Sequence, residues 1–280
     1  MTGEGPIVVR GAGDLGSAVV HRLFRVGYRV VALERRDPLV VRRTVSFAQA
    51  ILDGTVVVEG IEGRAASLEN VESIAEGADW PSWVPVVVDP DGEAIAALRP
   101  VAVIDARLAK TNLGTGREDA RVTIGLGPGF TAGEDVDYVV ETLRGHELGR
   151  LLTKGAAAPN TGVPGIVGGV GEGRVIRSPA SGAFTSVLKI GQLVEKGDVV
   201  GAVAGAEARA NVGGLLRGLV ADGTKMKAGQ KLGDVDPRGA EIDHTLISDK
   251  ARAVAGAVLE GLLLGGVLPD RGAARGGGDV

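Results

Sequence analysis

The hydrophobic pattern of the first 34 residues predicts a strand, a helix and a second strand. An apolar run at 7–9 ends in a glycine-rich turn at 11–16, and a second apolar run at 30–33 ends at Glu34. Between them, apolar residues recur every four positions: Leu15, Val19 and Leu23. That spacing places the three side chains on one face of a helix. The chain therefore opens with a predicted strand–helix–strand unit.

Further apolar runs, each ending in polar residues or glycine, predict more strands of the same sheet. They cover residues 55–59, 85–89, 101–104, 122–124 and 138–142. Shorter stretches with helical character lie between the earlier ones, at 44–52, 67–75 and 94–98. Alternation of this kind is typical of a parallel sheet with both faces covered. The pattern predicts a Rossmann-like, doubly wound α/β domain over residues 1–158.

The turn at 11–16 has the sequence G-A-G-D-L-G. In a G-x-G-x-x-G turn the first glycine allows the tight turn, the second lets a pyrophosphate approach the backbone, and the third lets helix and strand pack closely. The helix N-terminus offers N–H groups to phosphates, and an acid at the end of the second strand binds ribose hydroxyls. The predicted contacts of a dinucleotide-type ligand are Gly11, Gly13, Asp14, Gly16 and Glu34.

The identity of this ligand stays open. Glu34 disfavours a 2′-phosphate, whereas the basic residues Arg35 and Arg36 favour one, so the sequence does not choose between NAD and NADP. A second interpretation also stands, in which the glycines of a doubly wound fold serve packing alone.

Two polar stretches follow later strands, at the carboxyl ends where open α/β sheets bind ligands. The first, at 105–112, contains Lys110. The second, at 125–135, alternates glycines with apolar residues and can present successive N–H groups to an anion. Its candidate ligand contacts are Gly125, Gly127, Gly129 and Thr131. The alternative for this loop is a shape set by packing under the sheet.

A third polar loop, R-G-H-E-L-G-R at 144–150, contains His146. This histidine and Lys110 are the candidate proton donors if the chain catalyses a reaction. A structural role for His146 in its loop is the alternative. No metal site is predicted, because the three histidines of the chain lack the spacing of a zinc site.

The C-terminal half contains an internal repeat. Glycine and proline are abundant at 159–173, which predicts a linker. Beyond it, residues 181–203 align without gaps on residues 213–235, at an offset of 32. Two short halves of this kind cannot bury their apolar faces separately, so we expect them to pack on each other. The pattern resembles the biotinyl/lipoyl carrier family and implies an all-β barrel-sandwich hybrid over residues 174–247.

One departure from that family concerns the modified residue. Carriers modify a lysine at the hairpin that joins the two halves, but no lysine stands between Lys196 and Lys225, and Glu207 falls near the expected place. The module is therefore predicted to serve docking or homo-oligomerisation. A C-terminal helix is predicted over 248–264, followed by a flexible glycine-rich tail at 265–280.

Composition narrows the classes of function. A net charge of −4 and 3% aromatic residues argue against nucleic acid as a partner. The absence of cysteine removes thiol nucleophiles, thiolate metal sites and persulfide carriers. The segment 253–268 is too short and too broken by glycine to span a bilayer, and the first residues lack a signal-peptide pattern. We expect a soluble, cytoplasmic protein that does not bind membranes.

Taken together, these motifs resemble the selenium-dependent molybdenum hydroxylase accessory proteins, which are also grouped with xanthine dehydrogenase accessory proteins. The likeness spans roughly residues 6–264, and its most specific parts are 125–135 and 144–150. It implies a maturation factor for molybdenum hydroxylases such as xanthine dehydrogenase. Its partners would be the apo-hydroxylase or other maturation proteins, and its ligand NAD(P) or molybdopterin dinucleotide. Without cysteine, the chain cannot hold selenium as a perselenide.

Two other functions fit the same residues. One is an NAD(P)-dependent oxidoreductase. The other is a ligand sensor or scaffold that catalyses nothing. The sequence does not decide whether the protein is an enzyme.

Overall fold

The structure, a computed structural model, describes residues 5–77, 79–163 and 165–270. The chain divides into two compact units. The first, here called the sheet unit, comprises residues 1–38, 46–160 and 247–280; the second, the β unit, comprises residues 39–45 and 161–246. Each is described by itself.

A nine-stranded sheet forms the centre of the sheet unit, in the order β10-β9-β7-β6-β1-β2-β5-β4-β3. The strands are β1 (Ile7–Arg10), β2 (Val30–Glu34), β3 (Thr55–Val58), β4 (Ile61–Ala66), β5 (Val84–Val88), β6 (Ala102–Asp105), β7 (Val122–Leu126), β9 (Tyr138–Val140) and β10 (Leu151–Leu152). The seven inner strands run parallel, and the two edge strands, β3 and β10, are antiparallel to their neighbours. A separate two-stranded sheet pairs β8 (Thr131–Ala132) with β11 (Gly155–Ala156).

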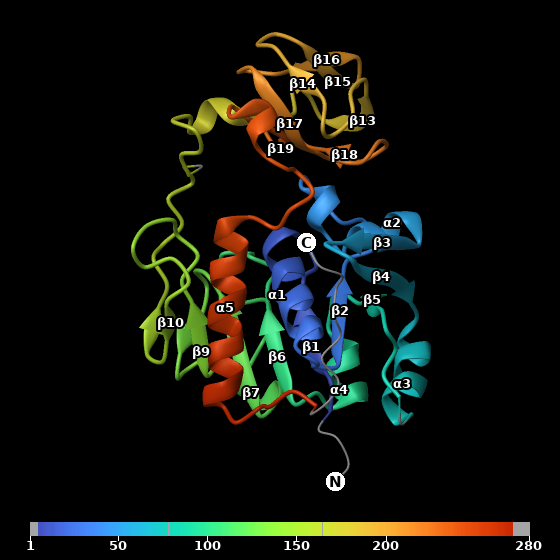
Figure 1. Cartoon of the computed structure of the whole chain (residues 1–280), viewed down its shortest axis with the longest axis vertical. Coiled ribbons are helices and arrows are strands. Elements are labelled where there is room, and N and C mark those ends of the chain that lie inside the picture. Colours follow the sequence, from blue (N-terminus) through green and yellow to red (C-terminus); the bar gives the residue numbers. More distant parts are fainter. Residues whose placement is uncertain (1–4, 78, 164, 271–280) are drawn as a thin grey trace. The chain divides into compact units, whose positions relative to one another are not determined.

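Within the described residues, five α-helices accompany this sheet: α1 (Asp14–Arg25), α2 (Gln49–Asp53), α3 (Leu68–Glu76), α4 (Glu93–Leu98) and α5 (Asp249–Leu264). Helix α5 packs beside α1 and against β7, β9 and β10 (Figure 1). Ser248 begins α5, because its side chain accepts a hydrogen bond from the N–H of Ala251. Val254, Val258 and Leu262 are fully buried on its inner face.

The prediction of a doubly wound, Rossmann-like sheet is wrong. A doubly wound sheet carries a helix in its crossover connections, but the connection from β6 to β7 contains only the 3₁₀ helix η2 (Arg117–Asp119), and the connection from β7 to β9 contains only β8. Hydrogen bonds from side chains hold these loops instead; Asp137, for example, accepts from the N–H and hydroxyl of Thr123 at 2.9 and 3.0 Å. The face beside β7 and β9 is covered by α5, from the other end of the chain.

The β unit consists of two four-stranded antiparallel sheets, ordered β12-β19-β17-β14 and β16-β15-β13-β18. The strands are β12 (Val175–Arg177), β13 (Gly182–Ser186), β14 (Leu193–Val194), β15 (Val199–Val203), β16 (Ala206–Arg209), β17 (Gly214–Leu219), β18 (Lys225–Met226) and β19 (Lys231–Asp236). Short 3₁₀ helices lie at η1 (Arg43–Val45), η3 (Glu172–Arg174) and η4 (Gly239–Glu241). Phe184, Leu216 and Val235 lie in its fully buried core.

Strand pairing in the β unit follows the repeat of the sequence. Strands β13, β14 and β15 lie in the first half of the repeat, and β17, β18 and β19 stand 32 residues further on, as the offset between Gly182 and Gly214 shows. Strand β14 pairs with β17, and β13 pairs with β18, so each half supplies a strand to the sheet of the other. The two halves therefore share one core.

The barrel-sandwich hybrid implied by the resemblance to biotinyl/lipoyl carriers is nevertheless wrong for this unit. Two strands outside the aligned halves, β12 and β16, extend the two sheets to four strands each. Glu207, expected near the tip of a hairpin that joins the halves, lies within β16 and pairs with Ala202 of β15. A repeat in the sequence does not reveal strands that lie outside it.

Among the described residues, no helix combines the length and apolar character needed to cross a bilayer. The predicted flexible tail at 265–280 lies mostly outside the described residues, because the description ends at residue 270.

Candidate ligand-binding edge of the sheet unit

The glycine turn, residues 11–16, connects β1 to α1 at the carboxyl edge of the sheet. Two of its glycines are required by the fold. Gly11 has a φ of +99°, and a Cβ there would lie 3.0 Å from the backbone of Ala106 and Arg107. A Cβ at Gly16 would lie 1.9 Å from the carbonyl oxygen of Gly11. Larger residues are excluded at both positions, whether or not a ligand binds.

Gly13 is different, because neither its conformation nor its packing requires glycine. Its φ is −73°, which any residue adopts, and a Cβ there would meet nothing within 4 Å. It is the N-cap of α1, and no side chain caps that end of the helix. The helix N-terminus carries a partial positive charge and N–H groups without partners in the helix. At this point the structure leaves space above the positive end of α1.

Glu34 lies at the end of β2 and is hydrogen-bonded into the turn. Its carboxylate accepts from the N–H of Ala12 at 3.0 Å and from the N–H of Arg35 at 2.8 Å. The hydroxyls of Ser17 and Ser46 both donate to the carbonyl oxygen of Ala12, at 2.7 and 2.6 Å. These four hydrogen bonds fix the turn and place the acid beside it.

A buried polar network that the sequence did not suggest lies at the adjacent ends of β1 and β6. Asp105, 2% exposed, forms an ion pair with Arg107 and accepts a hydrogen bond from the hydroxyl of Thr115 at 2.7 Å. That hydroxyl accepts in turn from Arg10 at 2.9 Å. Burial, and then the charge of Arg107, lower the pKa of Arg10. The network fixes the loop that follows β6, in which Lys110 is exposed with a φ of +67°.

The glycines of the predicted anion loop have packing roles. A Cβ at Gly125 would lie 2.5 Å from the ring of Phe130, and one at Gly129 would lie 2.7 Å from the backbone nitrogen of Thr111. Gly127 has a φ of +75°, and a Cβ there would lie 2.7 Å from the hydroxyl oxygen of Thr142. Close approach of the chain to itself therefore accounts for all three glycines.

Two N–H groups of this loop are already engaged. The N–H of Gly127 donates to the carbonyl oxygen of Val140 at 2.8 Å, and that of Thr131 donates to the carboxylate of Asp135 at 2.7 Å. Of the glycines among the predicted ligand contacts, Gly13 is thus the one that neither backbone conformation nor packing requires. His146 is exposed in the loop after β9, and no hydrogen bond joins it to a described residue.

Lys250, in the first turn of α5, was not found by sequence reasoning. It is half-buried, and it makes no hydrogen bond or ion pair with the residues that the structure describes. Burial, followed by the charge of Arg144, lowers its pKa. The carboxylates of Asp14 and Glu141 act in the opposite direction, which places the ammonium within electrostatic reach of the glycine turn. Its separation from Asp14 along the chain explains why no sequence pattern revealed it.

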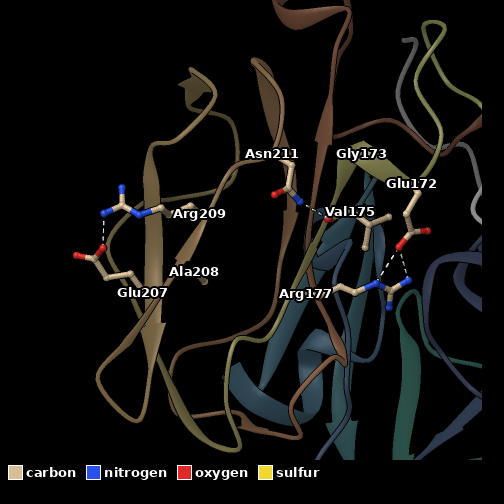
Figure 2. Close-up of a pocket in the computed structure, with 8 residues that line it drawn as sticks. All are labelled: Glu172, Gly173, Val175, Arg177, Glu207, Ala208, Arg209 and Asn211. Carbon is tan, nitrogen blue, oxygen red and sulfur yellow. Dashed lines mark hydrogen bonds and ion pairs between the residues drawn. The ribbon is translucent and has the colours of Figure 1, made fainter.

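A cavity of about 340 Å³ lies in the β unit, between β12 and β16 (Figure 2). Arg177 pairs with Glu172 on one wall, and Arg209 pairs with Glu207 on the other. Each wall thus pairs an arginine with a glutamate, and the charged side chains that line the cavity sum to zero. Across the described residues, no group of three or more histidine, aspartate and glutamate side chains is arranged to hold a metal ion.

No protein-family model matches the chain. Among curated proteins it is similar to the "Uncharacterized protein YqeB" of Escherichia coli (strain K12), with 47% identity over 265 residues. The alignment covers 94% of this chain but 48% of YqeB, so the chain spans about half the length of this relative. Activity and partners of the longer protein do not transfer on that basis.

Several solved structures show a weak likeness. One is an aspartoacylase family protein from Mesorhizobium loti, at 14% identity and a TM-score of 0.27 over 83% of this chain and 85% of that one. Another is the ectoine utilization protein EutE (DoeB) from Ruegeria pomeroyi, at 13% identity and a TM-score of 0.26 over 83% of this chain and 86% of that one. A third is a succinylglutamate desuccinylase/aspartoacylase from Rhodobacter sphaeroides, at 13% identity and a TM-score of 0.24 over 83% of this chain and 85% of that one. Likeness at this level carries no argument about the activity of this chain.

The comparisons contradict the resemblance to selenium-dependent molybdenum hydroxylase accessory proteins. Neither the curated relative nor the similar structures carry a name that concerns molybdenum, selenium or xanthine dehydrogenase. The predicted role in maturing molybdenum hydroxylases is therefore wrong. The two alternative functions, an NAD(P)-dependent oxidoreductase and a ligand sensor or scaffold, gain no support from these comparisons either.

Proposed function

We propose that the sheet unit binds a ligand with a diphosphate group, such as a dinucleotide, across the glycine turn. The observation that carries this proposal is Gly13. A glycine that neither φ nor packing requires stands at the uncapped N-terminus of α1, with open space above it. A diphosphate would fill that space and accept hydrogen bonds from the first turn of the helix.

Glu34 supports the same assignment. A carboxylate has about four acceptor positions on its two oxygens. The N–H groups of Ala12 and Arg35 take one on each oxygen, which leaves acceptor positions for two ribose hydroxyls. Lys250 would add a positive charge on the side of the turn where α5 begins.

Isothermal titration calorimetry with ADP-ribose, NAD⁺, NADP⁺ and molybdopterin dinucleotide tests the proposal. Binding of ADP-ribose and at least one dinucleotide is expected. Tighter binding of NAD⁺ than of NADP⁺ would show that repulsion of the 2′-phosphate by Glu34 outweighs its attraction to the neighbouring arginines, and the reverse order would show the opposite. The change Lys250→Gln should weaken binding about tenfold, equivalent to about 1.4 kcal/mol. A matched control is Lys154→Gln, at an exposed lysine between β10 and β11. If none of these ligands binds the unaltered chain, the proposal is wrong.

The cytoplasmic location remains a prediction. Fractionation of cells that produce the tagged chain, followed by immunoblotting of each fraction, would test it.

A further inference from the structure

Another cavity, of about 210 Å³, lies in the sheet unit between α1, α5 and the β3–β4 turn. Its charged or titratable lining residues are His21, Arg22, Arg25, Glu59 and Arg252. The remaining walls are small and aliphatic side chains. We call it the arginine cavity.

The charges of the arginine cavity do not balance. Its one carboxylate, Glu59, is 7% exposed and already bound, because it accepts from the N–H of Ile247 at 2.5 Å and from Arg252 at 3.1 Å. Arg22 and Arg25 form no hydrogen bond or ion pair with the residues that the structure describes. Two guanidinium groups therefore line the cavity with no anion to pair with them, unlike the cavity of the β unit.

Helix electrostatics explain part of this arrangement. Arg22 and Arg25 lie in the last turn of α1, where a positive charge stabilises a helix by about 0.3–1 kcal/mol. That effect does not account for the third arginine, which comes from α5, or for a cavity in which the three meet. The helix dipole also leaves unexplained why Glu59, which lies in a hairpin turn with a φ of +40°, forms an ion pair with Arg252.

We propose that the arginine cavity binds a small oxyanion, phosphate or carboxylate, held by Arg22 and Arg25. A guanidinium presents paired N–H donors that match the oxygens of both groups. The volume is below the roughly 300–1,000 Å³ of pockets for larger ligands, so it suits a single phosphate or a short dicarboxylate rather than a dinucleotide. The site is independent of the glycine turn, which lies at the other end of α1.

His21 provides a local probe of occupancy. It is buried, and its Nε2 lies 3.3 Å from the carbonyl oxygen of Glu59. Burial lowers its pKa, which the Glu59 carbonyl and carboxylate partly oppose, while Arg25 and Arg252 lower it further. An anion held by the arginines would screen these positive charges and raise the pKa of His21. Binding can therefore be followed by NMR of the histidine ring as well as by calorimetry.

The test is titration of the full chain with inorganic phosphate and, separately, with succinate, at low and constant ionic strength. We expect binding of at least one anion, with a shift of the His21 ring resonances. The double change Arg22→Gln, Arg25→Gln should weaken binding at least tenfold, and the single change Arg25→Gln, at an exposed side chain, should give a smaller loss in a chain that still folds.

Two controls separate this site from others. Arg209→Gln removes one exposed arginine from the β unit and should leave the affinity for phosphate and succinate within about twofold of that of the unaltered chain. Gly13→Asp obstructs the glycine turn and should leave phosphate binding and the His21 shift intact. Equal affinity for the Arg22/Arg25 variants and the unaltered chain would overturn the proposal, as would a signal lost with Gly13→Asp or no binding of either anion. Which of the two anions binds more tightly identifies the ligand class.

Discussion

Replacing Gly13 by aspartate separates ligand binding from folding in a way that few glycine substitutions do. Most glycines of a tight turn cannot be replaced without strain, as the 1.9 Å approach at Gly16 illustrates. Gly13 has an extended backbone, open space around its missing side chain, and the N-cap position of a helix with no side-chain cap. Aspartate is among the preferred residues at that position.

The expected effect on stability is small and positive. Aspartate exceeds glycine as an N-cap by a few tenths of a kcal/mol, and its charge at the helix N-terminus adds about 0.3–1 kcal/mol. The nearby carboxylates of Asp14 and Glu34 oppose a further negative charge, so we expect a net gain of about 0.5 kcal/mol. For a chain of this size that corresponds to a rise in Tm of about 1–2 °C. Gly13→Asn caps without the charge and should give a smaller rise.

The expected effect on ligand binding is large and opposite in sign. The new carboxylate would occupy the space proposed for the diphosphate and repel it, so affinity should fall at least a hundredfold, or about 2.7 kcal/mol. Scanning calorimetry of the free protein and titration with ADP-ribose measure the two effects on the same samples. A fall in Tm of several degrees would show that the geometry at Gly13 is misjudged. Unchanged affinity for ADP-ribose would refute the glycine turn as the binding site.

Three other substitutions test the structure at specific contacts. Gly16→Ala should destabilise the sheet unit by about 1–3 kcal/mol through overpacking, measured by urea denaturation. Thr115→Val removes the hydroxyl that Asp105 and Arg10 share and should cost about 1–3 kcal/mol in the same assay, without loss of helix content by circular dichroism. In the β unit, burial alone would raise the pKa of Asp234, but the cations around it lower the pKa overall. The ionised carboxylate therefore contributes its full stabilisation above the unfolded-state pKa of about 3.9, and this contribution declines as the pH falls through the lower folded-state pKa. Asp234→Asn should make the free energy of unfolding less dependent on pH in this acid range, measured by unfolding curves at several pH values.

The parts of the fold that depend on local sequence could be predicted. Apolar runs predicted six of the seven inner strands and the edge strand β3, but not the inner strand β4 (Ile61–Ala66), whose sequence I-E-G-R-A-A is not an apolar run. The turn at 11–16 was predicted from its glycine spacing, and Gly11 and Gly16 have the structural roles that this spacing implies. The serine cap at the start of α5 was also visible in the sequence. These features depend on neighbours within a few residues.

The parts that depend on distant contacts could not be predicted. The sequence identified α5 as a helix but not as the cover for β7 and β9, since that role depends on contacts with segments more than a hundred residues away. The same applies to Lys250 and to the hydroxyl of Thr115, which meets Arg10 across 105 residues. The family resemblance failed because glycine turns, apolar strands and a repeat recur in unrelated proteins.

The division of the chain into units has a consequence for proteolysis and for the dissection of the protein. The backbone passes between the sheet unit and the β unit four times, at residues 38/39, 45/46, 160/161 and 246/247. Cleavage at the glycine- and proline-rich connection near residue 161 leaves three covalent connections intact, so a single nick does not release either unit. A fragment that stops before residue 247 lacks α5 and exposes the apolar faces that α5 covers on α1 and the sheet. The two units are therefore one covalent assembly, and neither can be isolated by a single cut.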